Sequence, residues 1–189
     1  MESEVGIMAP QAPFNTKSTH TTLQPGSLPP IIEIPFQLLL ASLGTTDTAD
    51  SVTIASNSIV STYTSGFRHA TLSSLSLSIH PTLNAPSYPT TVQVVWVPSN
   101  SAATTSDILN VFGGQCFCIG GALQSTNPIN IPCNLTNFNP IIKDSVTYLD
   151  TPKLLFKSLA QATPPTVATC YLTLQGTIKL HSPLLQTSQ

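Results

Sequence analysis

Residues 91–121 constrain the fold more than any other part of the sequence. This stretch opens with Thr91–Val97, a run of β-branched and aromatic residues ended by a proline, and closes with the short apolar run Gln115–Ile119 between two glycine pairs. Runs of this kind are typical of buried strands. Between them the pattern predicts a short helix over Thr105–Phe112, with one of its first two residues as the cap. Two strands joined by a capped helical turn indicate part of an antiparallel β-sandwich.

About eight short strands are expected in all, separated by turns rich in proline and glycine. Besides the two above, strands are predicted at Ile34–Ser42, Ser51–Ala55, Thr71–His80, Asn130–Cys133, Lys153–Ala160 and Thr169–Leu180. Ser73 and Ser74 break the alternation of their strand, which predicts a β-bulge, and Pro132 confines its strand to a sheet edge. Ser58–Ser65 fits a strand or a helical turn, and Val146–Leu149 fits a turn or a short strand. This pattern is typical of a sandwich, a jelly roll or a barrel.

The first 28 residues differ from the rest, so we expect a flexible arm over residues 1–28 and one β domain over residues 29–189. Pro10, Pro13 and Pro25 interrupt the arm, and its apolar content is too low to order it alone. Its basic residues include Lys17 and His20. The arm is either a mobile terminus or a segment that becomes ordered only against neighbouring subunits.

Charged residues make up only 7% of the chain, against roughly 25% in an ordinary soluble domain. This neutral surface fits a secreted or stalk-like β domain, or a subunit that is largely covered by copies of itself. The second interpretation is favoured, because an uncharged monomer has poor solubility. Six Lys and Arg residues stand against eight acids, for a net charge of −2. If the protein meets RNA, other cations must therefore neutralise most of the phosphates.

The four cysteines, at positions 116, 118, 133 and 170, are expected to be free, small and buried. Cys116 and Cys118 share one face of a strand and cannot easily form a disulfide with each other, and their spacing is poor for zinc. Reduced thiols suit a cytosolic protein. The acidic start Met1–Glu4 does not resemble a signal peptide, and the apolar run Ile31–Leu43 is too interrupted to span a membrane.

Few residues are arranged for chemistry, so we expect no enzymatic activity, no cofactor and no metal. Asp144 and Asp150 lie close in sequence to Lys143 and Lys153, which predicts a salt-linked loop rather than an acid–base pair. The glycine pairs lack the spacing of a phosphate-binding loop.

A series of short motifs, found in order from about residue 30 to the C-terminus, resembles the tymovirus coat proteins. Each motif alone is weak, but the ordered set is specific. The motifs are Phe67–Ala70, Ile79–Leu83, Trp96–Ser101, Phe112–Gln115, Phe117–Ala122, Lys143–Ser145, Tyr148–Leu155 and His181–Leu184.

The resemblance implies an all-β, eight-stranded antiparallel jelly roll with a flexible N-terminal arm and short helical turns. It further implies a structural capsid protein of a small non-enveloped plant virus, assembled in the host-cell cytoplasm. Copies of the chain would occupy pentamers and hexamers of a T=3 icosahedral virion, with single-stranded genomic RNA inside and polyamines or other cations as counter-ions. The resemblance implies no membrane partner. Because empty shells are known in this family, contacts between protein subunits should drive assembly.

The resemblance also points to residues that contact RNA on the inner surface of the shell. Histidines at the positions matched by His69 and His181 are thought to share protons with the genome, and a protonated histidine contributes positive charge near pH 6. Arg68 joins them, and Lys17 and His20 would do so if the arm points inward. Without the resemblance, His69 and His181 would be interpreted as ordinary loop histidines. His80 is interpreted as a structural residue at a strand end.

Two other classes of protein remain as alternatives. A secreted β-sandwich that binds carbohydrates or cell surfaces would need a signal peptide, paired cysteines and an aromatic pocket, whereas Trp96 is predicted to lie in the core. A cupin-type enzyme would need a histidine-rich metal motif, which the sequence lacks.

Overall fold

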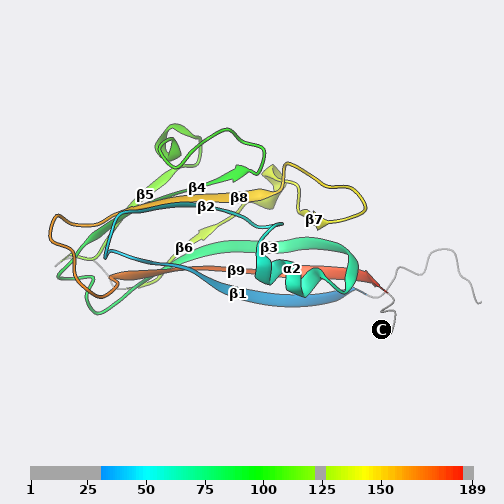
Figure 1. The fold of residues 1–189 in the computed structure, drawn as a ribbon, viewed down its shortest axis with the longest axis horizontal. Helices are drawn as coiled ribbons and strands as arrows, with labels where there is room; N and C mark the ends of the chain where they lie inside the picture. The colour runs from blue at the N-terminus through cyan, green and yellow to red at the C-terminus, as the bar shows by residue number, and fades with distance from the viewer. Residues whose placement is uncertain (1–30, 122–126, 185–189) are drawn as a thin grey trace, which may run out of the picture. The chain divides into compact units, whose positions relative to one another are not determined.

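The computed structural model describes residues 31–121 and 127–184 of the 189-residue chain. Nine strands in these residues form two antiparallel sheets that lie one over the other (Figure 1). The five-stranded sheet has the order β1-β9-β3-β6, with β7 also paired to β3, and the four-stranded sheet has the order β2-β8-β4-β5. The strands of the five-stranded sheet are β1 (Ile32–Leu43), β9 (Cys170–Pro183), β3 (Phe67–Pro81), β6 (Ile129–Pro132) and β7 (Ile141–Lys143). Those of the four-stranded sheet are β2 (Thr48–Thr53), β8 (Pro152–Leu159), β4 (Thr90–Pro98) and β5 (Gln115–Ile119).

The order of the strands is that of a jelly roll. The chain passes from one sheet to the other at most of its connections, and the first and last strands, β1 and β9, pair with each other. The predicted fold class is therefore confirmed, and each of the eight predicted strands is present. The prediction missed β7, which has only three residues.

Local features of the five-stranded sheet agree with the sequence. The register between β3 and β9 shifts between Leu72 and Ser74, which confirms the predicted bulge. Pro35 is tolerated within β1 because β1 lies at an edge of the sheet. The strands β3 and β9 are longer than predicted, so His69 and His181 lie on strands rather than in loops.

The core between the sheets explains the spacing of apolar residues. Leu77, Val94, Phe156 and Leu172 are fully or almost fully buried between the layers, and Trp96 packs against them as predicted. A second layer lies on the other face of the four-stranded sheet, where Ile108, Val95, Val97 and Leu155 form a separate cluster. Since β4 and β8 are buried on both faces near their centres, apolar residues stand next to each other there, in Val94–Val97 and Leu154–Phe156.

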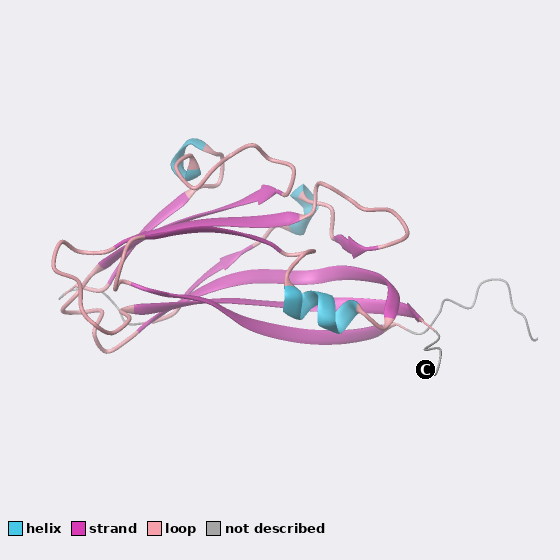
Figure 2. Cartoon of the chain, in the orientation of Figure 1, coloured by secondary structure: helices cyan, strands magenta, loops and turns pink. Residues whose placement is uncertain are grey.

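The helices differ from the prediction. In place of a helix over Thr105–Phe112 there is one 3-10 turn, η1 (Ile108–Asn110), because the Asp107 carboxylate accepts hydrogen bonds from the backbone N–H and hydroxyl of Thr104 and closes a turn before it. The ambiguous segment forms the helix α2 (Ser58–Thr64), whose N-terminus is capped by Asn57 (Figure 2). A second 3-10 turn is η2 (Leu135–Asn137).

The cysteines are only partly as expected. All four are free, and Cys133 and Cys170 are buried, as predicted. Cys116 and Cys118 are exposed, contrary to the prediction, because they lie on the face of the edge strand β5 that points away from the core.

Candidate nucleic-acid interface

The N-terminal end of β3 and the C-terminal end of β9 bring two of the predicted residues together. His69 and His181 are direct partners in the antiparallel pairing of these strands. Their rings stack, with centroids 4.6 Å apart and planes 18° from parallel. The histidines alternate with the buried residues Ala70 and Leu180, so both rings lie on the face of the sheet that points away from the core.

A carboxylate holds one of these rings. Nδ1 of His69 lies 2.9 Å from Oδ1 of Asp144, which follows β7. The backbone N–H of Ser145 donates to the same oxygen at 2.6 Å and lowers the pKa of the Asp144 carboxyl, and His69 lowers it further. The ionised carboxylate keeps the proton of the His69 ring on Nδ1, which leaves Nε2 for another partner.

The second ring is held by the side chain of the residue that follows it. Nδ1 of His181 lies 3.2 Å from the hydroxyl oxygen of Ser182. Ser182 has a φ of 57°, in the left-handed region, and no other non-glycine residue in the described segments has a positive φ. Such a conformation costs a residue other than glycine on the order of 1 kcal/mol.

A lysine and a glutamate complete the group. Lys179 precedes His181 on the same face of β9, and its Nζ lies 3.2 Å from Oε1 of Glu33 on β1. We call these residues the acid–histidine cluster: Glu33, His69, Asp144, Lys179 and His181. With neutral histidines, one lysine and two carboxylates give the cluster a formal charge of −1. Two protonated histidines would change it to +1.

The other predicted residues are not part of this arrangement. Arg68 is exposed at the start of β3, and alternation along the strand places it on the opposite face from His69. Within the described residues Arg68 has no hydrogen-bond or ion-pair partner. Lys17 and His20 lie outside the described residues.

The salt-linked loop predicted around Asp144 is not formed. Asp144 pairs with His69 instead, and the Nζ of Lys143 donates to the carbonyl oxygens of Thr64 and Ser65 at 2.8 and 3.4 Å. Lys153 donates to the carbonyl oxygens of Ser99 and Ser101. Each ammonium group is thus held by backbone carbonyls, a geometry that depends on tertiary packing. Because the spacing of charges in the sequence does not reveal this packing, the role of Asp144 was missed.

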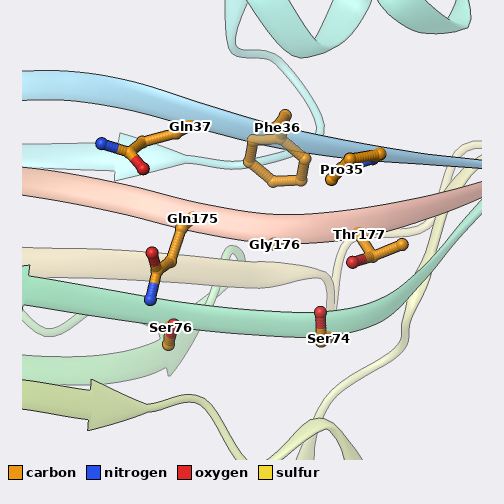
Figure 3. A pocket seen from close by; sticks show the side chains of 8 residues that line it. All are labelled: Pro35, Phe36, Gln37, Ser74, Ser76, Gln175, Gly176 and Thr177. Carbon is orange, nitrogen blue, oxygen red and sulfur yellow. The ribbon is translucent and has the colours of Figure 1, made fainter.

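Farther along the same face of the sheet is a neutral groove of about 440 Å³. Figure 3 shows Gln37 of β1, Gln175 of β9 and Ser76 of β3 side by side along it. Its lining residues are Pro35, Phe36, Gln37, Ser74, Ser76, Gln175, Gly176 and Thr177. None of them is ionisable, so the groove offers hydrogen bonds from amides and hydroxyls but no acid–base pair.

The described segments hold no group of three or more His, Cys, Asp or Glu side chains that could bind a metal ion. Across residues 31–121 and 127–184, no helix has the length and apolar content that crossing a membrane requires. In this part of the chain, the acid–histidine cluster joins two ion pairs and a stacked pair of histidine rings. It is therefore our candidate site.

Comparison with known proteins gives consistent matches over nearly the whole chain. The family model described as "Tymovirus coat protein" matches residues 19–189. The capsid protein of Kennedya yellow mosaic virus (strain Jervis bay) is 60% identical over 180 residues, which are 95% of this chain and 96% of that protein. The structure of Desmodium yellow mottle tymovirus is 60% identical, with a TM-score of 0.85 over 87% of this chain and 94% of that one. The empty head of turnip yellow mosaic virus is 49% identical, with a TM-score of 0.84 over 87% and 88% of the two chains.

Proposed function

Because this chain belongs to the tymovirus coat protein family, we propose that it builds a T=3 icosahedral shell around a positive-strand RNA genome. As a capsid protein it is a structural component of the virion, not an enzyme. Its low content of charged residues supports a surface that other copies cover in pentamers and hexamers, since neutral surface is buried at low desolvation cost. The empty head solved for a relative supports assembly driven mainly by contacts between subunits.

The assembly proposal is tested by sedimentation velocity of the purified full-length chain, with absorbance recorded for protein and for nucleic acid. We expect a fast boundary of shell size, and the ratio of the two absorbances will report packaged RNA. A single slow boundary of the 20.0 kDa monomer under conditions that favour assembly would contradict the proposal.

We further propose that the acid–histidine cluster contacts the RNA. The observation that supports this most strongly is the stacked pair His69–His181, beside carboxylates and a lysine, on one exposed face. Protonation changes the formal charge of the cluster from −1 to +1, and a positive cluster attracts phosphates. Neutral imidazole and the amides and hydroxyls of the neighbouring groove can pair with the edges of unstacked bases. Arg68, Lys17 and His20 would extend this surface.

The double variant His69→Ala with His181→Ala tests this contact. We expect shells to form, but to retain less RNA than wild-type shells at about pH 5, because the cluster can no longer become positive. His80→Ala is the matched control, since His80 lies at the other end of β3 and bonds to Thr173. Equal RNA retention in the double variant and the wild type from about pH 5 to about pH 7 would rule the contact out.

The counter-ions and the site of assembly are part of the same proposal. With a net charge of −2 the protein cannot neutralise a genome, so polyamines or other cations should be packaged with the RNA. Assembly in the host-cell cytoplasm is supported by four free cysteines. Analysis of polyamines released from purified particles, and localisation of assembling subunits in infected cells, would test these two points.

We assign residues 1–28 to an arm and residues 29–189 to the jelly-roll shell domain. The assignment is supported by the prolines and low apolar content of the first 28 residues. A chain lacking residues 1–28 should unfold at the same temperature as the full-length chain and differ only in the shells that it forms. A large loss of thermal stability would contradict this division.

A further inference from the structure

The edge strand β5 presents two free thiols on one face. Cys116 and Cys118 are two residues apart, and both are exposed. Phe117 and Ile119, which alternate with them, pack against the core between the sheets. The thiols therefore lie side by side on the outer face of the four-stranded sheet, away from the acid–histidine cluster.

The nearest neighbours of the thiols across the sheet are uncharged, and Lys157 of β8 lies one strand farther, opposite Gln93. On the neighbouring strand β4, Gln93 lies opposite Cys116 and Thr91 lies opposite Cys118. Since no group of three or more His, Cys, Asp or Glu side chains that could hold a metal lies within the described residues, the two sulfur atoms have no third partner of this kind. A metal bound by the pair therefore takes two sulfur donors from the described residues.

The spacing rules out a disulfide but allows a bridging ion. Residues two apart on an antiparallel strand have Cα atoms roughly 7 Å apart, whereas a disulfide needs sulfur atoms about 2 Å apart and Cβ atoms about 4 Å apart. Closing that gap would break the pairing of β5 with β4. A linear S–metal–S unit needs sulfur atoms roughly 4.5 Å apart for metal–sulfur bonds near 2.3 Å. Both χ1 = 180° and χ1 = −60° are common on strands, so two thiols in different rotamers can reach that separation.

We propose that Cys116 and Cys118 form a two-coordinate binding site for copper(I). Thiolates are soft ligands that select Cu(I) and zinc among the metals of the cell. Zinc takes four ligands, whereas Cu(I) is stable between two thiolates in a line, so the number of donors selects copper. Binding releases two protons to solvent and transfers no electron. The bound unit, one Cu(I) and two thiolates, carries a charge of −1.

The remaining cysteines do not compete for the ion. Burial raises the pKa of the Cys133 thiol to about 12 and that of the Cys170 thiol to about 11, so both stay protonated. Neither is exposed to solvent in the subunit. The exposed pair is thus the part of the described chain that a thiophilic ion can reach.

The test is a titration of the purified, unassembled full-length chain with Cu(I) under anaerobic, reducing conditions, in competition with the chromophoric chelator bicinchoninate. We expect one copper per chain and an ultraviolet copper–thiolate band. Cys116→Ser and Cys118→Ser should each lower the affinity by about 100-fold, because the second thiolate acts at high effective concentration. Gln115→Ser is the matched control, since it places the same residue on the same strand and keeps both thiols.

Three outcomes would overturn the proposal. The first is the absence of bound copper in a chain whose circular dichroism and unfolding temperature show that it is folded. The second is unchanged affinity in either cysteine variant. The third is zinc binding of equal strength, which would contradict the selection of the metal by two donors. Repeating the titration on assembled shells will show whether the site remains accessible there, with the same variants identifying the bound ion.

Discussion

Asp144 is the residue on which the orientation of the histidine pair depends. Its carboxylate accepts from His69 and from Ser145, so it links the segment after β7 to the start of β3. Because the ring of His69 stacks on His181, a change at Asp144 reaches both histidines. The carboxylate is thus a positioning group for the proposed RNA contact.

Replacement of Asp144 by alanine should make stability depend less on pH. The lowered pKa of Asp144 means that its ionised form stabilises the folded state. This contribution is present above the ordinary carboxyl pKa of 3.8 and is lost as the pH falls through the lowered value. Thermal unfolding should therefore show a lower midpoint for Asp144→Ala than for the wild type at about pH 7, and a shrinking difference below about pH 4.

The control for this prediction is Asp150→Ala. Asp150 is an exposed acid in the same connection between β7 and β8, and within the described residues its carboxylate has no hydrogen-bond partner. An equal effect of both substitutions at every pH would mean that the contact with His69 and Ser145 contributes nothing.

His69 and His181 could be predicted as site residues from the sequence, but the stacking of their rings could not. They lie on β3 and β9, more than a hundred residues apart, and only the register of the sheet makes them neighbours. Arg68 is next to His69 in sequence, yet strand alternation directs it to the other face. Resemblance to a family identifies residues, whereas distances between them depend on strand pairing.

The elements differ in how well local pattern predicts them. The strands β4 and β8 were clear because burial on both faces leaves adjacent apolar residues at their centres. The segment that forms α2 was ambiguous because its Ser, Thr and Val residues favour strands as much as helices. The Asn57 cap and the burial of Val60 stabilise the helix over the strand. The predicted helix over Thr105–Phe112 was wrong because the Asp107–Thr104 turn precedes η1 and because Ile108 packs against Val95 and Val97 of β4.

The C-terminus of α2 is held by a lysine from a different element. Lys143, the last residue of β7, donates to the carbonyl oxygens of Thr64 and Ser65, which have no partner within the helix. Lys143→Met keeps most of the side-chain volume but removes the donor. We expect a loss of about 1 kcal/mol in the free energy of unfolding, measured by urea denaturation.

Lys157→Met serves as the comparison. Lys157 lies on β8 and, within the described residues, its ammonium group has no hydrogen-bond partner, so its replacement should change the free energy of unfolding by less than about 0.5 kcal/mol. If the two variants lost equal stability, the cap on α2 would be unimportant.

The described part of the subunit leaves large apolar side chains uncovered. Leu83 is 98% exposed and Phe112 is 100% exposed. In a capsid protein such residues are candidates for contacts with neighbouring subunits, because a few buried aromatic and aliphatic side chains contribute most of the energy of an interface.

Phe112→Ser should impair assembly while leaving the subunit folded. We expect the protein concentration needed for shell formation to rise by about tenfold or more, measured by light scattering, with an unchanged unfolding temperature. Ile108 lies four residues earlier and is fully buried, so Ile108→Ser should instead lower the unfolding temperature. Normal assembly of Phe112→Ser would exclude this side chain from the subunit contacts.

The pairing of β9 between β1 and β3 has a consequence for synthesis on the ribosome. The strand that completes the five-stranded sheet begins at Cys170, so β1 and β3 lack their shared partner until β9 has been translated. Such long-range pairing closes slowly. A prematurely terminated chain therefore lacks the centre of the sheet and cannot present the surfaces of a finished subunit. In this topology, translation of β9 is the step after which the five-stranded sheet of the subunit can form.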